Sequence, residues 1–136
     1  MSDQIFFDTN IIVYLYSDDQ VGKRTTIEQL LEKKTHVTIS TQVINEFAYV
    51  MIRKRKLAYS IIMKAIDELE AVFNVTHIDF QTIRYALKIA DKHQYSYFDS
   101  LMIASAIESG CNIMYTEDLH DSHVIDRKLK IVNPFD

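Results

Sequence analysis

The sequence predicts a three-layer α/β fold, in which a mostly parallel sheet of about five strands is flanked by helices. Short apolar or β-branched segments alternate with longer segments of helical apolar spacing along the 136-residue chain. This alternation is typical of the crossovers that join parallel strands. The length fits a single domain, residues 1–136, and no repeat or linker interrupts it.

The individual elements follow from apolar spacing, helix caps and turn residues. Gly110 is expected to end the helix that precedes it, and Asp79 is expected to cap another. The expected strands are 5–7, 36–40, 74–78, 112–116 and 130–132, and the expected helices are 11–16, 22–34, 42–54, 57–73, 80–93 and 96–109. In the helix 80–93, the residues expected to face the core are Phe80, Ile83, Leu87 and Ala90.

The composition excludes several classes of protein. With only two glycines, the chain has no glycine-rich phosphate loop and no dinucleotide-binding fingerprint. The net charge of −4 gives no overall basic field for nucleic acid, which leaves room only for a local basic patch. The one cysteine, Cys111, is expected to be a small buried residue in a reducing, cytoplasmic protein. No segment has the pattern of a membrane span or a signal peptide, so no membrane association is expected.

The first strand leads directly into an acidic residue, in the stretch Ile5-Phe6-Phe7-Asp8-Thr9-Asn10. Thr9 or Asn10 can cap the helix that follows. Asp8 therefore lies where a buried strand turns into a helix, the edge at which open α/β sheets bind ligands. The alternative is that Asp8 only helps to cap the helix.

Other acids are expected at the same edge, because right-handed crossovers place all strand-to-helix junctions there. Glu46 follows the second strand, and Glu117 and Asp118 follow the fourth. Asp99 joins them if its helix starts at this edge, although its spacing from Ser96 also fits a capping box. Two carboxylates about 6 Å apart repel by roughly 3 kcal/mol, and a divalent cation removes that cost. Oxygen ligands without paired cysteines favour Mg²⁺ or Mn²⁺, and such ions support phosphodiester hydrolysis.

Four short motifs in order make the chain resemble PIN-domain proteins, and in particular the small VapC-like toxin ribonucleases. The motifs are Asp8-Thr9-Asn10, Asn45-Glu46-Phe47, Asp99-Ser100-Leu101-Met102-Ile103-Ala104 and Thr116-Glu117-Asp118-Leu119, and the match continues to Val132-Asn133-Pro134-Phe135. The resemblance implies a parallel sheet of about five strands, cleavage of RNA with Mg²⁺ or Mn²⁺, a homodimer and inhibition by a small antitoxin.

Position by position, the resemblance assigns the acidic metal site to Asp8, Glu46, Asp99 and Asp118. Asp8 and Asp99 would be direct ligands, whereas Glu46 and Asp118 would bind directly, bind through water or orient the attacking water. Thr116 matches a hydroxyl residue beside the last acid, and Thr9 and Asn10 would shape the loop at Asp8. Glu117 has the opposite strand parity from Asp118. If Asp118 points into the cleft, Glu117 is expected to point away, although a bend there could reverse the two.

The chain departs from this family in one loop. Many relatives have a glycine where this chain has Asp121-Ser122-His123, and another near Arg127, so the loop conformation is expected to differ. His120 and His123 could suggest a zinc pair, but no third nitrogen or sulfur ligand lies nearby in the sequence. We therefore expect solvated histidines.

The run Arg53-Lys54-Arg55-Lys56 is the best candidate for contact with RNA phosphates, although such runs are usually solvated helix ends. A non-catalytic RNA-binding or partner-sequestering module on the same fold is an alternative, but it would usually lack one of the acids. An aspartate-nucleophile phosphatase is a second alternative. It would usually have an acid where this chain has Asn10, and a lysine near the end of the last strand.

Overall fold

The computed structural model describes residues 3–33 and 36–135. Lys34, the last residue of one predicted helix, lies outside this range. The strands are β1 (Ile5–Phe7), β2 (Val37–Ser40), β3 (Asn74–Thr76), β4 (Ile113–Tyr115), β5 (Val124–Ile125) and β6 (Leu129–Val132). The helices are α1 (Thr9–Leu15), α2 (Val21–Lys33), α3 (Thr41–Arg53), α4 (Tyr59–Val72), α5 (Phe80–His93) and α6 (Tyr97–Glu108).

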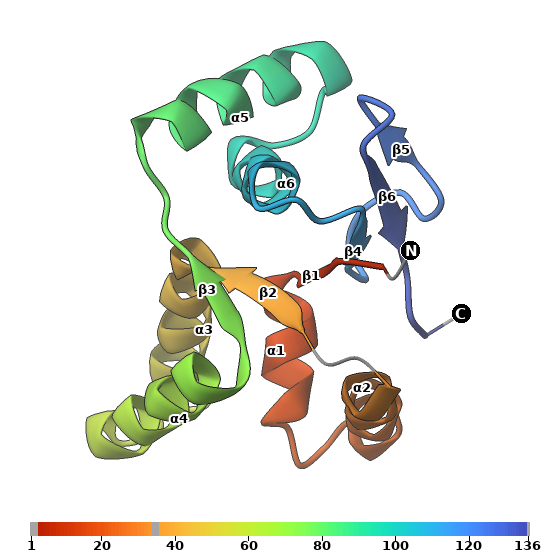
Figure 1. Ribbon diagram of the computed structural model, residues 1–136. Coiled ribbons are helices and arrows are strands. Elements are labelled where there is room, and N and C mark those ends of the chain that lie inside the picture. The colour runs from red at the N-terminus through yellow and green to blue at the C-terminus, as the bar shows by residue number, and fades with distance from the viewer. Residues whose placement is uncertain (1–2, 34–35, 136) are drawn as a thin grey trace.

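The strands form one sheet in the order β3-β2-β1-β4-β6-β5 (Figure 1). All neighbours are parallel except β5, which pairs antiparallel with β6. The central strand β1 pairs with both β2 and β4, and Phe7 at its end lies opposite Tyr115. The residues that follow β1 and β4 therefore meet at the carboxyl edge of the sheet.

Helices cover both faces of the sheet, which gives the predicted three-layer α/β architecture (Figure 1). One layer holds α5 and α6, with α6 packed on β2, β4 and β6. The other layer holds α1 to α4, with α3 packed on β2. Since α6 lies between the sheet and α5, seven consecutive residues of this helix, 100–106, are buried. This position explains why its sequence is apolar all round.

Two predictions about the fold differ from the structure. The sheet has six strands rather than about five, because the two-residue strand β5 is too short to give a periodic signal. The predicted inward face of α5 is wrong, since Phe80 and Leu87 are exposed and Ile83 and Ala90 are only half-buried. The buried residues of α5 are Thr82, Ala86 and Ile89.

Other local predictions are confirmed. Asp79 caps α5 in a full capping box with Thr82. Gly110, with φ +84°, ends α6 in a Schellman motif, in which the Cys111 amide donates to the Ala106 carbonyl at 2.9 Å. Cys111 is buried, and this burial raises the pKa of its thiol. Across residues 3–33 and 36–135, no helix is both long and apolar enough to cross a membrane.

Candidate active site

Asp8 is the residue at which the sheet and α1 meet. It is the N-cap of α1, and one carboxylate oxygen accepts a hydrogen bond from the Thr9 amide at 2.7 Å. The other oxygen accepts from the Thr116 hydroxyl at 2.8 Å. The cap is thus Asp8 itself, rather than Thr9 or Asn10 as expected. Its amide in turn donates to the Tyr115 carbonyl at 3.0 Å, which extends the β1–β4 pairing to the edge.

The cap does not fully stabilise the charge on Asp8. Burial raises the pKa of this carboxyl from 3.8 to about 6, because only 6% of the residue is exposed. Burial is the largest cause of this net rise, the nearby charges of Asp99 and Glu46 contribute to it, and the hydrogen bonds from Thr116 and Thr9 oppose it. Asp8 is therefore a carboxylate in an acidic neighbourhood, and its hydrogen-bond donors within the described residues are a hydroxyl and an amide rather than a cation.

Glu46 reaches the same edge from the second turn of α3. One of its carboxylate oxygens accepts a hydrogen bond from the Thr9 hydroxyl at 3.2 Å. The other oxygen accepts from the Gln42 side-chain amide at 3.1 Å, one helical turn earlier. Sequence reasoning missed Gln42, although its i, i+4 spacing from Glu46 was a usable signal. Thr9 thus links the start of α1 to α3.

Asn10, on α1, holds the side chain of Asp118. The Asn10 side-chain amide donates to the Asp118 carboxylate at 2.7 Å and to the Thr116 hydroxyl at 3.4 Å. The Asp118 amide also donates to the Thr116 hydroxyl, at 3.2 Å. Glu117 points away from this network, toward Tyr14 and Lys23, as its strand parity predicted. Thr116 therefore contacts both Asp8 and Asp118.

Asp99 lies in the first turn of α6 and is half-buried. Its amide donates to the Ser96 hydroxyl at 3.2 Å, which is one half of the predicted capping box. Its carboxylate lies near enough to Asp8 to raise that pKa. The next residue, Ser100, carries the one buried side-chain oxygen in the described part of the chain without a hydrogen-bond partner. Such an oxygen usually binds water or a ligand.

The four acids approach the same edge but do not form a ready-made metal cage. Within residues 3–33 and 36–135, no group of three or more His, Cys, Asp or Glu side chains is placed to hold one metal ion. Three of the acids instead accept hydrogen bonds from neutral donors: Thr9 and Thr116 hold Asp8, Thr9 and Gln42 hold Glu46, and Asn10 holds Asp118. Mutual repulsion keeps uncompensated carboxylates apart.

Comparison with known proteins identifies the family. The PIN domain family model matches residues 5–125. The chain belongs to the PIN domain family. No curated protein sequence matches it.

Solved structures share the fold of this PIN domain at low sequence identity. A toxin–antitoxin complex from Klebsiella pneumoniae has a TM-score of 0.73 and 19% identity, over 97% of this chain and 98% of that chain. The DNA-bound VapBC of Salmonella typhimurium has a TM-score of 0.71 and 17% identity, over 96% and 97%. The Mycobacterium tuberculosis toxin VapC20, which cleaves the sarcin-ricin loop, has a TM-score of 0.69 and 22% identity, over 85% and 90%.

The basic run of this PIN domain begins at the end of α3. Arg53 is the last residue of this helix and follows Glu46 by seven residues, about 10 Å along the helix axis. Arg53, Lys54 and Lys56 are exposed. Arg55 instead donates to the Ser17 hydroxyl at 2.9 Å and pairs with Asp19 at 3.6 Å, so its role within the run is partly structural.

The loop after Asp118 has left-handed backbone at two of the positions singled out in the sequence. Ser122 has φ +68° and Arg127 has φ +56°. The expectation of solvated histidines is wrong for His123, since Tyr95 contacts its ring nitrogen at 2.5 Å and the His93 ring packs edge-on against it. His120 is exposed, as expected.

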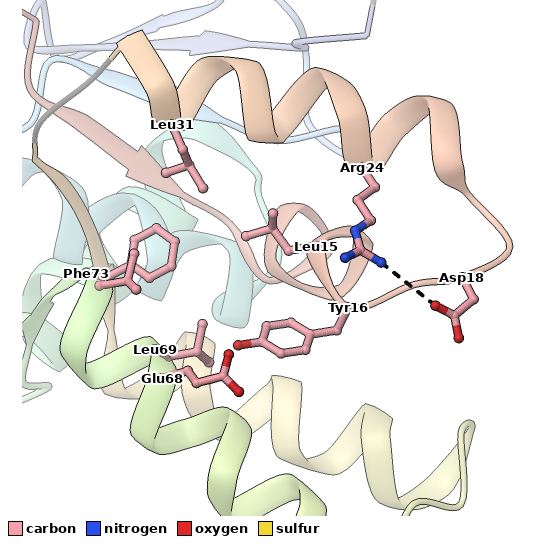
Figure 2. A pocket seen from close by; sticks show the side chains of 9 residues that line it. Leu15, Tyr16, Asp18, Arg24, Leu31, Glu68, Leu69 and Phe73 are labelled. Atoms are coloured by element: carbon pink, nitrogen blue, oxygen red, sulfur yellow. Dashed lines mark ion pairs between the residues drawn. The ribbon is translucent and has the colours of Figure 1, made fainter.

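A hollow of about 420 Å³ lies away from the acids, between α2, α4 and the end of α1 (Figure 2). Figure 2 shows apolar side chains along its walls and an ion pair between Arg24 and Asp18, at 3.8 Å, on one side. Glu68 lies beside Tyr16, and its charge adds to the burial that raises the pKa of this tyrosine. The apolar lining residues are Leu15, Leu31, Leu69, Val72 and Phe73.

Proposed function

We propose that this PIN domain is a metal-dependent endoribonuclease, and that it is the toxin of a toxin–antitoxin pair. The observation that carries the proposal is Asp8. This buried carboxylate has its pKa raised to about 6 by burial and by the charges of Asp99 and Glu46. Perturbed acids of this kind cluster at functional sites. A VapC toxin among the proteins of similar fold cleaves the sarcin-ricin loop, which supports RNA as the substrate class.

The residues at this edge fit a divalent cation. The donor set consists of carboxylate, hydroxyl and amide oxygens, which suits Mg²⁺ or Mn²⁺. A bound cation would lower the cost of ionising Asp8 beside Asp99 and Glu46. When bound, such an ion supplies an activated water and stabilises charge on the phosphoryl group.

We assign each acid a role from its contacts. Asp8 and Asp99 would bind the metal directly, since Asp8 is fixed by two hydrogen bonds and Asp99 lies near it. Glu46 and Asp118 would bind the metal, directly or through water, or orient the attacking water. Thr9, Asn10 and Thr116 would hold these carboxylates in place.

Cleavage of RNA by the purified protein tests the proposal. Activity is expected with Mg²⁺ or Mn²⁺, none with EDTA, and little with Asp99→Asn, because each change removes part of the metal site. Glu28→Gln, which removes a carboxylate from an exposed ion pair with Arg24, is the matched control and should remain active. Cleavage that survives both EDTA and Asp99→Asn would refute the assignment.

A non-catalytic RNA-binding or partner-sequestering module is the second candidate. The absence of a preformed metal cage among the described residues favours it. The two candidates differ in one result, since the module would bind RNA without cutting it at any Mn²⁺ concentration.

We further propose a small antitoxin as partner, and the hollow in Figure 2 as its docking site. The apolar walls suit an apolar face of the antitoxin. Of the structures of similar fold, one is a toxin–antitoxin complex and another is a DNA-bound VapBC. Val72 is 64% exposed at the hollow, whereas Leu87 is 56% exposed on α5. Val72→Glu should weaken a co-expressed complex, and Leu87→Glu should not. Equal effects would exclude this docking site.

Dimerisation is part of the same proposal, and it is supported only by the family resemblance. Sedimentation of the purified protein tests it, because a homodimer has twice the mass of the 15.9 kDa chain. A monomer at all concentrations would contradict it.

A further inference from the structure

Two neighbouring carboxylates at the end of β4 are held by different partners. Asp118 accepts a hydrogen bond from the Asn10 side-chain amide at 2.7 Å. Glu117 accepts one from the Tyr14 hydroxyl at 2.5 Å and forms an ion pair with Lys23. The two acids follow one another in the chain after β4, and their contacts lie one helical turn apart on α1, so these tertiary contacts fix where each side chain lies.

Two of the residues that hold the two acids lie on one face of α1. Asn10 and Tyr14 are four residues apart and therefore lie on the same side of this helix. Asn10 also accepts a hydrogen bond from the Glu117 amide at 3.4 Å, so it holds the backbone of the turn as well as the Asp118 side chain. Helix α1 thus contacts residues 117 and 118 through two side chains, Asn10 and Tyr14, that lie one helical turn apart.

Lys23, on α2, contacts both Glu117 and Tyr14. Its ammonium lies 4.7 Å from the ring centroid of Tyr14 and 5.2 Å from that of Phe135. The Tyr14 and Phe135 rings pack edge to face at 5.5 Å. The Lys23 and Glu117 side chains are 32% and 27% exposed, so the two rings shield a pair that would be weak in open solvent.

We propose that Tyr14, Lys23 and Glu117 are positioning residues that hold Asp118 in its contacts with Asn10 and Thr116. They act through Asp118 and contact neither substrate nor metal. Holding the Glu117 carboxylate at Tyr14 and Lys23, one helical turn from Asn10, keeps it from competing with Asp118 for the Asn10 amide. The inference rests on the proposed metal-dependent ribonuclease for its effect on activity, but its structural part does not depend on that function.

Two variants of the cluster test the inference. Lys23→Met keeps the apolar stem and removes the charge, and Glu117→Gln keeps the shape and removes the charge of the partner. Each should raise the Mn²⁺ concentration for half-maximal cleavage about 10-fold, because residues that orient metal ligands typically contribute 10- to 100-fold. Lys23→Arg should restore most of the affinity. Glu28→Gln, on the same helix but linked only to Arg24, should leave it unchanged.

A readout without metal or RNA separates this inference from the proposed function. The side-chain amide ¹⁵N–¹H signals of Asn10, measured by NMR, report its hydrogen bond to Asp118. In Lys23→Met and Glu117→Gln these signals should move toward their position in Asp118→Ala, while the backbone spectrum elsewhere is retained.

The outcomes of these experiments are distinct. An inactive wild type whose Asn10 signals still shift in the variants would refute the ribonuclease and keep the positioning cluster. Unchanged Asn10 signals in both variants would overturn the positioning cluster, even in an active ribonuclease. A change in thermal stability alone, with no change in Mn²⁺ dependence or in the Asn10 signals, would also overturn it.

Discussion

Asp8 and Asp126 both lie directly after strands of the same sheet, but their hydrogen-bond partners and neighbouring charges differ. Asp126, in the turn between β5 and β6, accepts hydrogen bonds from Lys92 at 3.0 Å, from His93 at 3.1 Å and from the Tyr85 hydroxyl at 3.0 Å. These partners, Lys92 above all, lower its pKa to about 2. Asp8 has a hydroxyl, an amide and two acidic neighbours, and its pKa is raised to about 6.

The difference separates an acid whose charge the fold stabilises from the acid that we propose as a metal ligand. The donors around Asp126 fully compensate its charge and offset its left-handed backbone, with φ +51°. The charge of Asp8 is compensated only in part, and a cation would complete it. An acid at a strand end therefore indicates a site only when its partners leave its charge unsatisfied.

The largest expected difference between the two acids is in catalysis. Asp8→Asn should reduce metal-dependent RNA cleavage by 100-fold or more, on the order of 3 kcal/mol in the activation free energy. Asp126→Asn should stay within about 3-fold of wild type. Single-turnover cleavage rates of both variants provide the measurement. Equal reductions would remove the distinction between the two regions.

The next difference is in stability without metal. A pKa raised from 3.8 to about 6 means that the folded state loses up to about 3 kcal/mol as pH rises through this window. Asp8→Asn removes this loss and weakens one hydrogen bond, so it should be neutral or stabilising by up to about 2 kcal/mol at pH 7. Urea unfolding in EDTA measures the change. A clear destabilisation at pH 7 would show that the Asp8 charge is already compensated.

Asp126→Asn should have the opposite sign. Because the pKa of Asp126 is lowered in the folded state, its charge stabilises the fold above pH 4, and the contribution disappears as pH falls toward about 2. With a side chain 21% exposed, we expect a loss of about 1–2 kcal/mol at pH 7. The difference in urea midpoint between Asp126→Asn and wild type should be clearly smaller at pH 2.5 than at pH 7. The same loss at both pH values would mean that charge is not the cause.

The smallest effect concerns the basic run. Reversing Arg53, Lys54 and Lys56 to Glu should weaken RNA binding and reduce its salt slope by about 0.7 for each phosphate that is no longer neutralised. Binding is measured over a range of salt in the Asp99→Asn background, so that the RNA stays intact. Reversal of Arg84, Lys88 and Lys128, which line another hollow, is the matched control. If both triple variants behave alike, the run is a solvated helix end.

Much of the fold follows from local sequence signals. Strand-to-helix alternation predicted the three-layer sheet, and the caps at Asp79 and Gly110 predicted helix ends. The inward face of α5 could not be predicted from apolar residues, because Phe80 and Leu87 lie on its exposed side while Thr82 is buried and bonds Glu108 at 2.6 Å. A small polar residue that finds a tertiary partner leaves no periodic signal.

The candidate site was predictable only in part. Four motifs in order nominated the acids, and strand parity favoured Asp118 over Glu117 but left open a bend that would reverse the two. The hydrogen bonds that hold each acid depend on tertiary contacts, such as Thr9 with Glu46 and Asn10 with Asp118. The pairing of Arg55 with Asp19 likewise joins segments far apart in the chain.

The most direct test of the proposed cation site at the carboxyl edge of the sheet is thermal unfolding with and without Mn²⁺. At a hundred times its Kd, Mn²⁺ stabilises a binding protein by about 2.7 kcal/mol. For a chain of this size that corresponds to a Tm increase of roughly 5–10 °C. We expect this increase in wild type and in Asp126→Asn, and its loss in Asp99→Asn. An unchanged Tm in wild type, or a full increase in Asp99→Asn, would contradict it.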